Sequence, residues 1–382
     1  MAIDSWVLAS RFRHQGTHVY ARSLITEFRR MAAGRRDLSF CLFQSPGDSN
    51  DASRMAAGIG FQLSPQSGMR HDRWWRFRGA EQAAARVHAD LLFAPTASLF
   101  AGGRVPVVCT IPDVTPVVMP THSWKVTLLQ RSLLRSLAQR ARAIITISEC
   151  SKRDLVDLYG VPESRVSVVY PGYDKSVFNC TQPDRLAHEA LLRRLGLVRP
   201  YVLHHGTLQP RKNLKKLIEA YRLLLSRNRS LDVDLVLAGE LGWRHQETVA
   251  AAAEPAGSRG RVLLPGALDD GDLALLVKGA SLAVIPSLYE GFCLPMVEAM
   301  ACGTPTIASQ TSCLPEVSGN ALQYFDPRSA DDMAGCMEHA LQSRELRAVL
   351  AQKGAARAQQ FDWRRCAQQT LDVLERAAQE GR

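Results

Sequence analysis

Short apolar segments alternate with longer amphipathic segments along most of the chain. Six β-rich apolar segments occupy the first half, at residues 2–10, 38–44, 90–95, 105–111, 143–148 and 166–172. The rhythm restarts near residue 199, with segments at 201–206, 233–239, 261–266, 282–287, 305–309 and 321–325. Apolar strands that alternate with helices are typical of parallel sheets covered on both faces. The pattern predicts an α/β protein with two Rossmann-like, doubly wound domains.

The stretch between the two series predicts the domain boundary. VYPGYDKSVFNCTQPD at 169–184 contains Pro, Gly and Asn, which favour turns and linkers. We expect an N-terminal domain over 1–176, a hinge over 177–198 and a C-terminal domain over 199–360.

Length and composition fit this organisation. The chain has 382 residues, which suits two domains, and 46% hydrophobic with 22% charged residues is an ordinary soluble composition. No apolar run approaches the roughly 20 residues of a membrane span, and the N-terminus has no apolar signal core. The nine cysteines form no C-x-x-C pair. We therefore expect a reduced, cytoplasmic protein.

The net positive charge indicates the chemical class of the binding partner. The 47 Lys and Arg residues outnumber the 37 Asp and Glu residues, for a net charge of +10. A basic surface favours anionic partners such as nucleotide phosphates, lipid headgroups or nucleic acid, although most single arginines are expected to be solvated.

The ends of the predicted strands supply the candidate site residues, because open α/β sheets bind ligands at the carboxyl ends of their strands. Most of these candidates lie in the second half of the chain. They are Gly16, Pro112, Asp113, Gly206, Gly239, Glu240, Gly266 and residues 287–291.

One strand end, YEGFCLPMVEAMACGTP at 289–305, predicts an anion site. Gly291 permits a tight turn, and Pro295 fits the first turn of a helix. The backbone N–H groups near Phe292, Cys293 and Leu294 are then available to a negatively charged ligand.

The same stretch holds two glutamates, Glu290 and Glu298. A carboxylate accepts hydrogen bonds from two hydroxyls, which suits sugars and riboses. Together with the anion site, the pair indicates a nucleotide sugar. Each glutamate also has a simpler explanation: Glu298 is favourable at a helix N-terminus without a ligand, and Glu290 could be a solvated loop charge.

The stretch HHGTLQPRKN at 204–213 predicts a phosphate-binding loop. Arg211 offers planar paired donors and Lys212 a mobile point charge at the entry of a helix, a combination that suits a diphosphate. Lys215 and Lys216 belong to the helix body and are expected to face solvent.

Together, G-T-L-x-P-R-K-N and P-S-x-Y-E-G-F-x-L-P-x-x-E-A-M-A-C-G-T-P resemble the retaining glycosyltransferases of family 4, in particular bacterial mannosyltransferases of surface-polysaccharide assembly. The resemblance covers nearly the whole chain. It implies the GT-B fold, in which two Rossmann-like domains face a central cleft, and a C-terminal helix at 361–382 that packs back on the first domain.

The resemblance also implies roles for the strand-end residues. The residue matching Glu290 contacts the donor sugar near the reacting centre, and the one matching Glu298 holds the ribose hydroxyls. The pair matching Arg211 and Lys212 binds the donor diphosphate. The glycine matching Gly16 lets the backbone of the first domain approach the phosphates. No metal and no cofactor are expected.

One position departs from the family pattern. Family members often have T-I-H-D at a first-domain strand end, and several use that histidine to contact the transferred sugar; this chain has Pro112 there. The role could pass to Asp113, to His122 or to His18, or no such contact could be needed.

The expected reaction is retaining transfer of a hexose, with mannose from GDP-mannose as the first choice. The expected acceptor is a hydroxyl of a growing, polyprenyl-diphosphate-linked oligosaccharide. The alternatives are rhamnose, glucose or N-acetylglucosamine from a UDP or dTDP donor, or a sugar-nucleotide epimerase. A front-face route is favoured over double displacement through Glu290.

Other chemistries fit less well. Asp232-Val233-Asp234 is a D-x-D triplet, but it opens a strand and is interpreted as a solvated strand start. His204 and His205 are expected to point to opposite faces without metal-ligand company. No G-x-G-x-x-G or Walker loop follows a strand, and nothing besides charge favours nucleic acid.

Two basic segments raise the question of a membrane surface. Residues 69–79 combine arginines Arg70, Arg73, Arg76 and Arg78 with Trp74, Trp75 and Phe77. One interpretation is docking on the anionic inner face of the plasma membrane. The other is that the three aromatic residues pack inside the first domain and the arginines are ordinary surface. For 123–143 we favour a simpler interpretation, with Leu129, Leu133 and Leu137 facing the core and Arg131 and Arg135 facing water.

Overall fold

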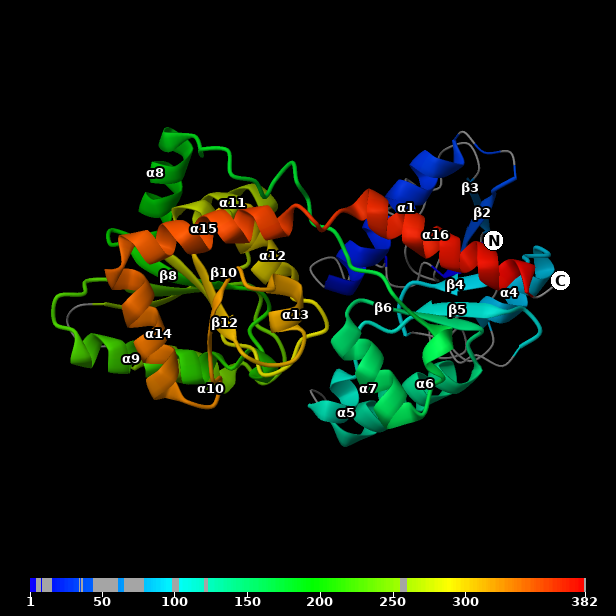
Figure 1. Cartoon of the computed structure of the whole chain (residues 1–382), viewed down its shortest axis with the longest axis horizontal. Helices are drawn as coiled ribbons and strands as arrows, with labels where there is room; N and C mark the ends of the chain where they lie inside the picture. Colours follow the sequence, from blue (N-terminus) through cyan, green and yellow to red (C-terminus); the bar gives the residue numbers. More distant parts are fainter. Residues whose placement is uncertain are drawn as a thin grey trace. The chain divides into compact units, whose positions relative to one another are not determined.

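The chain forms two compact units (Figure 1). The computed structural model describes residues 1–4, 8, 16–33, 35, 37–43, 61–64, 79–97, 103–119, 123–254 and 260–380. Unit 1 consists of Met1–Gly172 and Phe361–Arg382, and unit 2 of Tyr173–Gln360. The basic segment at 69–78 and His122 lie outside the described residues.

Unit 1 is built on a seven-stranded parallel sheet of order β3-β2-β1-β4-β5-β6-β7. The chain order reverses at β1, which pairs with both β2 and β4. The strands are β1 (Ala2–Asp4), β2 (Phe40–Phe43), β3 (Phe61–Ser64), β4 (Leu92–Ala94), β5 (Val107–Thr110), β6 (Ala143–Thr146) and β7 (Val166–Val168).

Helices cover this sheet, and α1 packs against the C-terminal helix α16. Phe28 of α1 stacks on Phe40 with 5.2 Å between ring centroids, and Leu371 and Leu374 of α16 join the same buried cluster. The helices are α1 (Gly16–Ala32), α4 (Ala80–Arg86), α5 (Thr115–Val118), α6 (Trp124–Arg140), α7 (Glu149–Tyr159) and α16 (Trp363–Gln379), with a 3-10 turn η4 (Glu163–Arg165).

Unit 2 is built on a six-stranded parallel sheet of order β10-β9-β8-β11-β12-β13. Its chain order reverses at β8, which pairs with both β9 and β11. The strands are β8 (Tyr201–His205), β9 (Asp234–Ala238), β10 (Val262–Gly266), β11 (Leu282–Ile285), β12 (Thr306–Ser309) and β13 (Gln323–Phe325).

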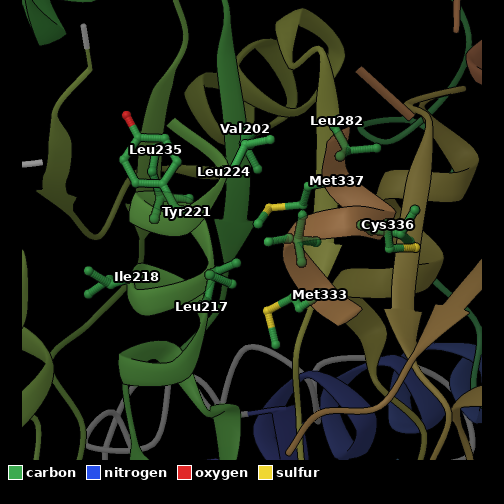
Figure 2. Close-up of a cluster of buried hydrophobic side chains, with 14 of the residues drawn as sticks. Val202, Leu217, Ile218, Tyr221, Leu224, Leu235, Leu282, Met333, Cys336 and Met337 are labelled. Atoms are coloured by element: carbon green, nitrogen blue, oxygen red, sulfur yellow. The ribbon is translucent and has the colours of Figure 1, made fainter. Parts of the chain in front are cut away.

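One face of the unit 2 sheet is covered by α9 and α14, whose apolar side chains meet over the strands (Figure 2). Tyr221 lies fully buried there and its hydroxyl donates to Val233 O at 2.7 Å. The helices of the unit are α8 (Arg185–Leu195), α9 (Leu214–Arg227), α10 (Gln246–Ala253), α11 (Asp270–Gly279), α12 (Leu294–Ala301), α13 (Leu314–Ser318), α14 (Ala330–Gln342) and α15 (Arg344–Ala358), with the 3-10 turn η5 (Pro210–Lys212).

The predicted doubly wound α/β class is confirmed, and each of the twelve predicted apolar segments contains one strand. The sequence interpretation missed β3, a four-residue strand at the edge of its sheet. Its sequence, FQLS, contains no two adjacent apolar residues, so it forms no apolar run.

The predicted hinge at 177–198 is placed too far along the chain, because these residues belong to unit 2. Helix α8 packs against α11. Lys278 Nζ donates to Asn179 Oδ1 and to Thr181 O, both at 3.1 Å. These contacts hold the segment on its own unit, and the chain passes between the units at Gly172 and again at Gln360.

The two chain segments that enter unit 1, at Gly172 and at Asp362–Trp363, lie in close backbone contact. A Cβ atom on Gly172 would lie 2.2 Å from Trp363 N and 2.6 Å from the carbonyl carbon of Asp362. Tyr20 packs edge-on against the Trp363 ring, with the centroids 6.0 Å apart. Only a residue without a side chain fits at position 172.

We expect Gly172→Ala to destabilise unit 1 by about 1–3 kcal/mol, because backbone atoms must move to admit the methyl group. Calorimetry should show a melting temperature lowered by roughly 2–4 °C per kcal/mol. The control is Gly335→Ala in α14, where nothing lies within 4 Å of the added Cβ. That change should stabilise by about 0.5–1 kcal/mol. Equal melting temperatures for Gly172→Ala and wild type would contradict the close approach.

Candidate active site

The candidate site lies where the strand order of unit 2 reverses. Strands β8 and β11 are neighbours there although they are far apart in sequence, so the loops after them meet at the same sheet edge. Leu288 N donates to Arg211 O at 2.8 Å, which joins the two loops through their backbones. The predicted Arg-Lys loop and the predicted glutamate loop are thereby brought together.

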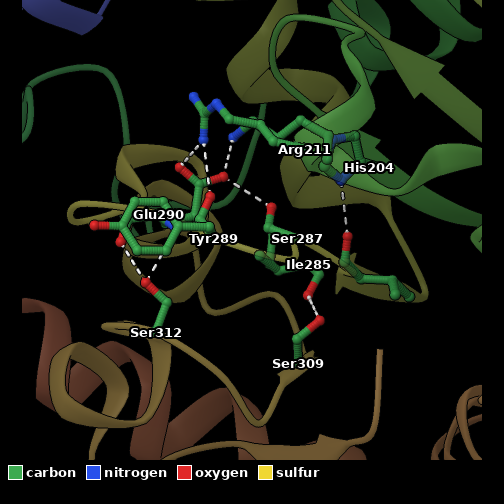
Figure 3. Close-up of polar contacts among 10 residues, drawn as sticks. His204, Arg211, Ile285, Ser287, Tyr289, Glu290, Ser309 and Ser312 are labelled. Carbon is green, nitrogen blue, oxygen red and sulfur yellow. Dashed lines mark hydrogen bonds and ion pairs between the residues drawn. The ribbon is translucent and has the colours of Figure 1, made fainter. Parts of the chain in front are cut away.

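Glu290 is the centre of this arrangement, with only 4% of its surface exposed (Figure 3). Its Oε1 lies 2.6 Å from Lys212 Nζ and accepts from Ser287 Oγ at 2.8 Å. Its Oε2 pairs with Arg211 Nη1. Ser312 Oγ accepts from Glu290 N at 3.1 Å and donates to Glu290 O at 2.6 Å.

The charge state of Glu290 follows from these neighbours. Burial alone would raise its pKa, but the charges and hydrogen bonds of Arg211 and Lys212 outweigh burial and lower the pKa to about 2. The carboxylate is ionised at neutral pH, and the cluster of two cations and one anion keeps one excess positive charge. The alternative of a solvated loop charge for Glu290 is wrong.

Glu298 in α12 contacts a residue that the sequence interpretation did not connect with it. Its Oε2 lies 3.1 Å from His205 Nε2 at the end of β8. His205 is 2% exposed, whereas the Glu298 side chain is 19% exposed. A carboxylate only accepts, so His205 donates through Nε2. The buried imidazole therefore orients one oxygen of Glu298.

His204 is buried on the other side of β8. Its Nδ1 donates to Val284 O at 3.0 Å. Burial, followed by the charge of Lys212, lowers the pKa of His204 to about 3, so the ring is neutral. Its Nε2 is then an acceptor, for which the described residues supply no hydrogen-bond partner.

Glycines end three adjacent strands at this edge. Gly206, Gly239 and Gly266 all have positive φ angles. Gly206 N donates to Ala238 O at 2.9 Å, and Gly239 N donates to Gly266 O at 2.8 Å. A Cβ on Gly239 would lie 2.1 Å from Gly206 O. Because these glycines have no side chains, the backbones of the neighbouring strand ends lie close together beside the Glu290 cluster.

The N-terminus of α12 lies over this edge, since a Cβ on Gly206 would approach Pro295 Cγ to 3.4 Å. No side chain in the described part of the chain caps the helix. Its N-cap, Cys293, has φ 73°, which is strained for a residue with a side chain. Phe292 and Cys293 are both buried, and burial raises the pKa of the Cys293 thiol to about 12.

Strained backbone gathers around the cluster. Positive φ angles occur at Asn213, which follows Lys212, at Cys293, and at Ser312, which holds the Glu290 backbone. Such angles cost about 1–3 kcal/mol each and persist where surrounding contacts enforce them.

The candidates of the first half lie in unit 1. Gly16 begins α1 and His18 is buried in that helix. Asp113 Oδ1 accepts from Thr115 N at 2.8 Å, so this carboxylate fixes the first turn of α5.

The D-x-D triplet is not a solvated strand start. Asp234 is fully buried, accepts from Arg261 N at 2.9 Å and pairs with Arg199 and Arg261. Asp232 is exposed and pairs with Arg199 at 2.6 Å. The triplet is a structural ion-pair network. Among the described residues, no three His, Cys, Asp or Glu side chains gather in a way that could hold a metal ion.

Comparisons with known proteins match both units. Residues 15–177 match the family described as "Glycosyltransferase Family 4", and residues 194–357 match "Glycosyl transferases group 1". The O-antigen chain mannosyltransferase B of Escherichia coli is 33% identical over 271 residues, covering 70% of this chain and 69% of that protein. The serotype-specific mannosyltransferase WbdA of Escherichia coli is 29% identical over 277 residues, but this chain spans only about a third of its length.

Among solved structures, Anabaena Alr3699/HepE in complex with UDP and glucose superposes with a TM-score of 0.72. The match covers 98% of both chains at 18% sequence identity, so it establishes the fold.

Glu290→Gln tests the charge cluster by removing the anion while keeping its shape. We expect the free energy of unfolding to fall by about 3–5 kcal/mol at pH 7, because buried Lys212 and partly buried Arg211 lose their partner. A lowered folded pKa stabilises the protein above the unfolded pKa, and this contribution is lost as pH falls through the folded value. Denaturant unfolding should show a constant difference in the free energy of unfolding between wild type and Glu290→Gln down to about pH 5. This difference should narrow between roughly pH 4 and 2.

The matched control is Glu247→Gln. Glu247 pairs with Lys215 at 3.4 Å in an exposed pair, so its loss should change stability by less than about 0.5 kcal/mol. A difference between wild type and Glu290→Gln that does not change with pH would show that the Glu290 charge is not stabilising.

Proposed function

The chain belongs to the glycosyltransferases that join a family 4 domain to a group 1 domain in the GT-B fold, and on this premise we propose that it transfers mannose from GDP-mannose. The proposed acceptor is a hydroxyl of a growing, lipid-linked oligosaccharide, and the anomeric configuration is retained. The observation that carries the proposal is the cluster of Arg211, Lys212 and Glu290 beside the N-terminus of α12, which no side chain of the described residues caps.

This cluster suits a nucleoside diphosphate for electrostatic reasons. Two cations share one carboxylate, which leaves one excess positive charge at the sheet edge. The α12 N-terminus adds backbone donors and the positive end of a helix dipole. Both features favour an anion that carries negative charge on several oxygens.

Glu298 supports recognition of the ribose. One carboxylate oxygen accepts from buried His205, and the side chain is partly exposed. A carboxylate held in one orientation can accept from vicinal hydroxyls without losing much side-chain freedom on binding. His205 is therefore proposed as a positioning residue for Glu298.

The proposed mechanism stabilises the leaving group. Negative charge grows on the diphosphate as the bond to the sugar breaks, and Arg211, Lys212 and the α12 N-terminus are preorganised to receive it. Both oxygens of Glu290 are already engaged, and its lowered pKa makes it a weak base. We therefore propose that Glu290 orients the two cations. We also propose that it contacts the donor sugar, as the family resemblance implies. The leaving phosphate then accepts the proton of the acceptor hydroxyl in a front-face reaction.

Mannose and GDP are proposed because mannosyltransferases are among the similar proteins. Rhamnose, glucose or N-acetylglucosamine from a UDP or dTDP donor is the alternative, as is a sugar-nucleotide epimerase. An epimerase would release no nucleotide in proportion to a glycosylated product, so that measurement separates the classes.

The acceptor is proposed to be a polyprenyl-diphosphate-linked oligosaccharide at the inner face of the plasma membrane. In the part of the chain that the structure describes, no helix is long and apolar enough to cross a membrane. Gly16 and Gly266 are proposed to contact the donor, and Asp113 is proposed as a catalytic residue that contacts the transferred sugar in place of the family histidine. No cofactor and no metal is proposed to take part, since Arg211 and Lys212 already supply positive charge to the diphosphate.

A thermal-shift screen tests the donor. GDP and GDP-mannose should raise the melting temperature more than UDP, dTDP and their sugars, because a ligand at 100 times its Kd stabilises the native state by about 2.7 kcal/mol. Release of GDP from GDP-mannose should persist in EDTA. If only UDP or dTDP raised the melting temperature, the proposed donor nucleotide would be wrong. If activity were lost in EDTA and restored by Mg²⁺, the proposed metal independence would be wrong.

Two substitutions test the site. Glu298→Ala should mainly raise the KM for the donor, because the ribose loses its acceptor. Glu290→Ala should mainly lower kcat, by about 10²–10³, because the cations lose their orientation. The kinetics should be measured below the melting temperature of each variant, with Glu247→Ala as the surface control. Variants that both match wild type would refute the site.

A further inference from the structure

Two cysteines that are far apart in sequence meet at the C-terminal end of α12. Cys180 lies in the first segment of unit 2, and Cys302 directly follows the last residue of the helix. Cys180 Sγ donates to Ala301 O at 3.2 Å. In the opposite direction, the backbone N–H of Asn179 donates to the Cys302 thiol. Each thiol therefore contacts the residue next to the other cysteine.

The covalent geometry of the chain keeps the two sulfurs close. Ala301 O belongs to the same planar peptide unit as Cys302 Cα, so the Cys180 sulfur contacts the backbone that carries Cys302. A Cβ atom on Gly303 would also lie 3.3 Å from Cys180 Sγ. A disulfide joins cysteines whose Cα atoms lie within about 7 Å of each other. The two reciprocal contacts favour this range, with rotation about the side-chain torsions as the remaining movement.

Other contacts hold the backbone on both sides of the pair. Lys278 Nζ donates to Asn179 Oδ1 at 3.1 Å, which fixes the residue before Cys180. Cys302 N donates to Glu298 O at 3.0 Å, which closes the last turn of α12. Because both segments are held without a covalent link, the two cysteines stay together while both thiols are reduced.

The two thiols differ in their access to solvent. Of the nine cysteines, all of which lie among the described residues, Cys180 is the one that is exposed. Cys302 is 8% exposed, and burial raises the pKa of its thiol to about 12, although the charge of Lys278 acts in the opposite direction. A dissolved oxidant therefore reaches Cys180 first, and Cys302 lies beside it as the second thiol.

We propose that Cys180 and Cys302 form a reversible oxidation site that takes a hydroperoxide as its oxidant and closes to a disulfide. The Cys180 sulfur attacks one peroxide oxygen, so an S–O bond forms, the O–O bond breaks and the other oxygen leaves as water. The Cys302 sulfur then attacks the Cys180 sulfur, so the S–S bond forms and the S–O bond breaks. Two thiols are oxidised, one hydrogen peroxide is reduced to two waters, and the two thiol protons leave in those waters.

The disulfide restrains the helix that carries Glu298. Cys302 lies one turn after Glu298, so a bridge ties this end of α12 to the first segment of unit 2, and reduction releases it. The oxidation site does not rest on the proposed sugar transfer, because its evidence lies at the opposite end of α12 from the Glu290 cluster.

A metal site and simple packing are the other interpretations of the pair. In the part of the chain that the structure describes, no three His, Cys, Asp or Glu side chains gather in a way that could hold a metal ion. Lys278 also places a positive charge near the pair, which disfavours a cation. Packing accounts for buried Cys302, but less well for exposed Cys180, whose sulfur contacts polar backbone.

Peptide mapping of the full-length protein tests the proposal. The reduced protein is treated with an equimolar amount of hydrogen peroxide, the remaining thiols are blocked with iodoacetamide, and the digest is analysed by mass spectrometry. We expect a peptide pair that joins Cys180 to Cys302 and is lighter than the two reduced peptides by two hydrogen atoms. Dithiothreitol should restore both thiols.

Variants separate the roles of the two thiols. Cys180→Ser changes an exposed side chain, so it should abolish the linked peptide and leave the melting temperature of the reduced protein and the release of donor nucleotide unchanged. Cys302→Ser should leave oxidised Cys180 as a sulfenic acid that dimedone traps. The matched control, Cys150→Ser, changes a half-buried cysteine of unit 1 and should form the linked peptide like wild type.

Oxidation should also raise the melting temperature of wild type by several degrees, because a disulfide that closes a long loop restricts the unfolded chain. Cys180→Ser should show no such rise. Three outcomes would overturn the proposal: no Cys180–Cys302 peptide in oxidised wild type, a bridge from Cys180 to a different cysteine, or a melting temperature that does not rise after the bridge forms. Loss of sugar transfer with the linked peptide intact would refute the proposed function and not this site.

Discussion

The burial of one carboxylate between two cations determines the shape of the strand-end loops in unit 2. An isolated ionised side chain at 4% exposure is costly by several kcal/mol, so Glu290 requires partners with defined geometry. Lys212 and Arg211 come from the loop after β8, Ser287 from the loop after β11, and Ser312 from the segment before α13. The carboxylate thus joins the loop after β8 to the loop after β11, and the backbone of Glu290 holds the segment before α13 through Ser312.

Burial also limits which side chains near Glu290 carry a charge. His204 lies beside Lys212, and a second protonated group there would add repulsion to an already cationic cluster. Burial keeps that imidazole neutral, with its Nδ1–H used by Val284 O. The excess positive charge therefore resides on Arg211 and Lys212. The arrangement explains how the folded protein tolerates the two cations at this strand end, and it leaves positive charge for the proposed diphosphate.

Much of the fold and part of the site follow from local sequence. Apolar runs marked twelve strands because a strand buried on both faces must be apolar, and strand-end loops marked Glu290, Arg211 and Lys212. The remaining features depend on tertiary contacts. The pairing of His205 with Glu298 joins positions 93 residues apart, and the burial of Asp234 depends on two distant arginines. The signal for His205 was its place at the end of β8, which pointed to the site without identifying its partner. The hinge was misplaced because turn-rich composition does not reveal that Lys278 and α11 hold the following segment.

Unit 1 is discontinuous in sequence, and this has a consequence for how the chain is made. Its core includes Leu371 and Leu374 of α16, which are synthesised after all of unit 2. While the ribosome is still adding the last residues, unit 2 already has its complete sequence and unit 1 does not. Domains usually fold in order from the N-terminus during synthesis. Here unit 2 can complete its fold before unit 1 does. Until α16 docks, the apolar side chains of α1 that pack against it stay open to solvent, so we expect the nascent N-terminal half to be the part more exposed to aggregation.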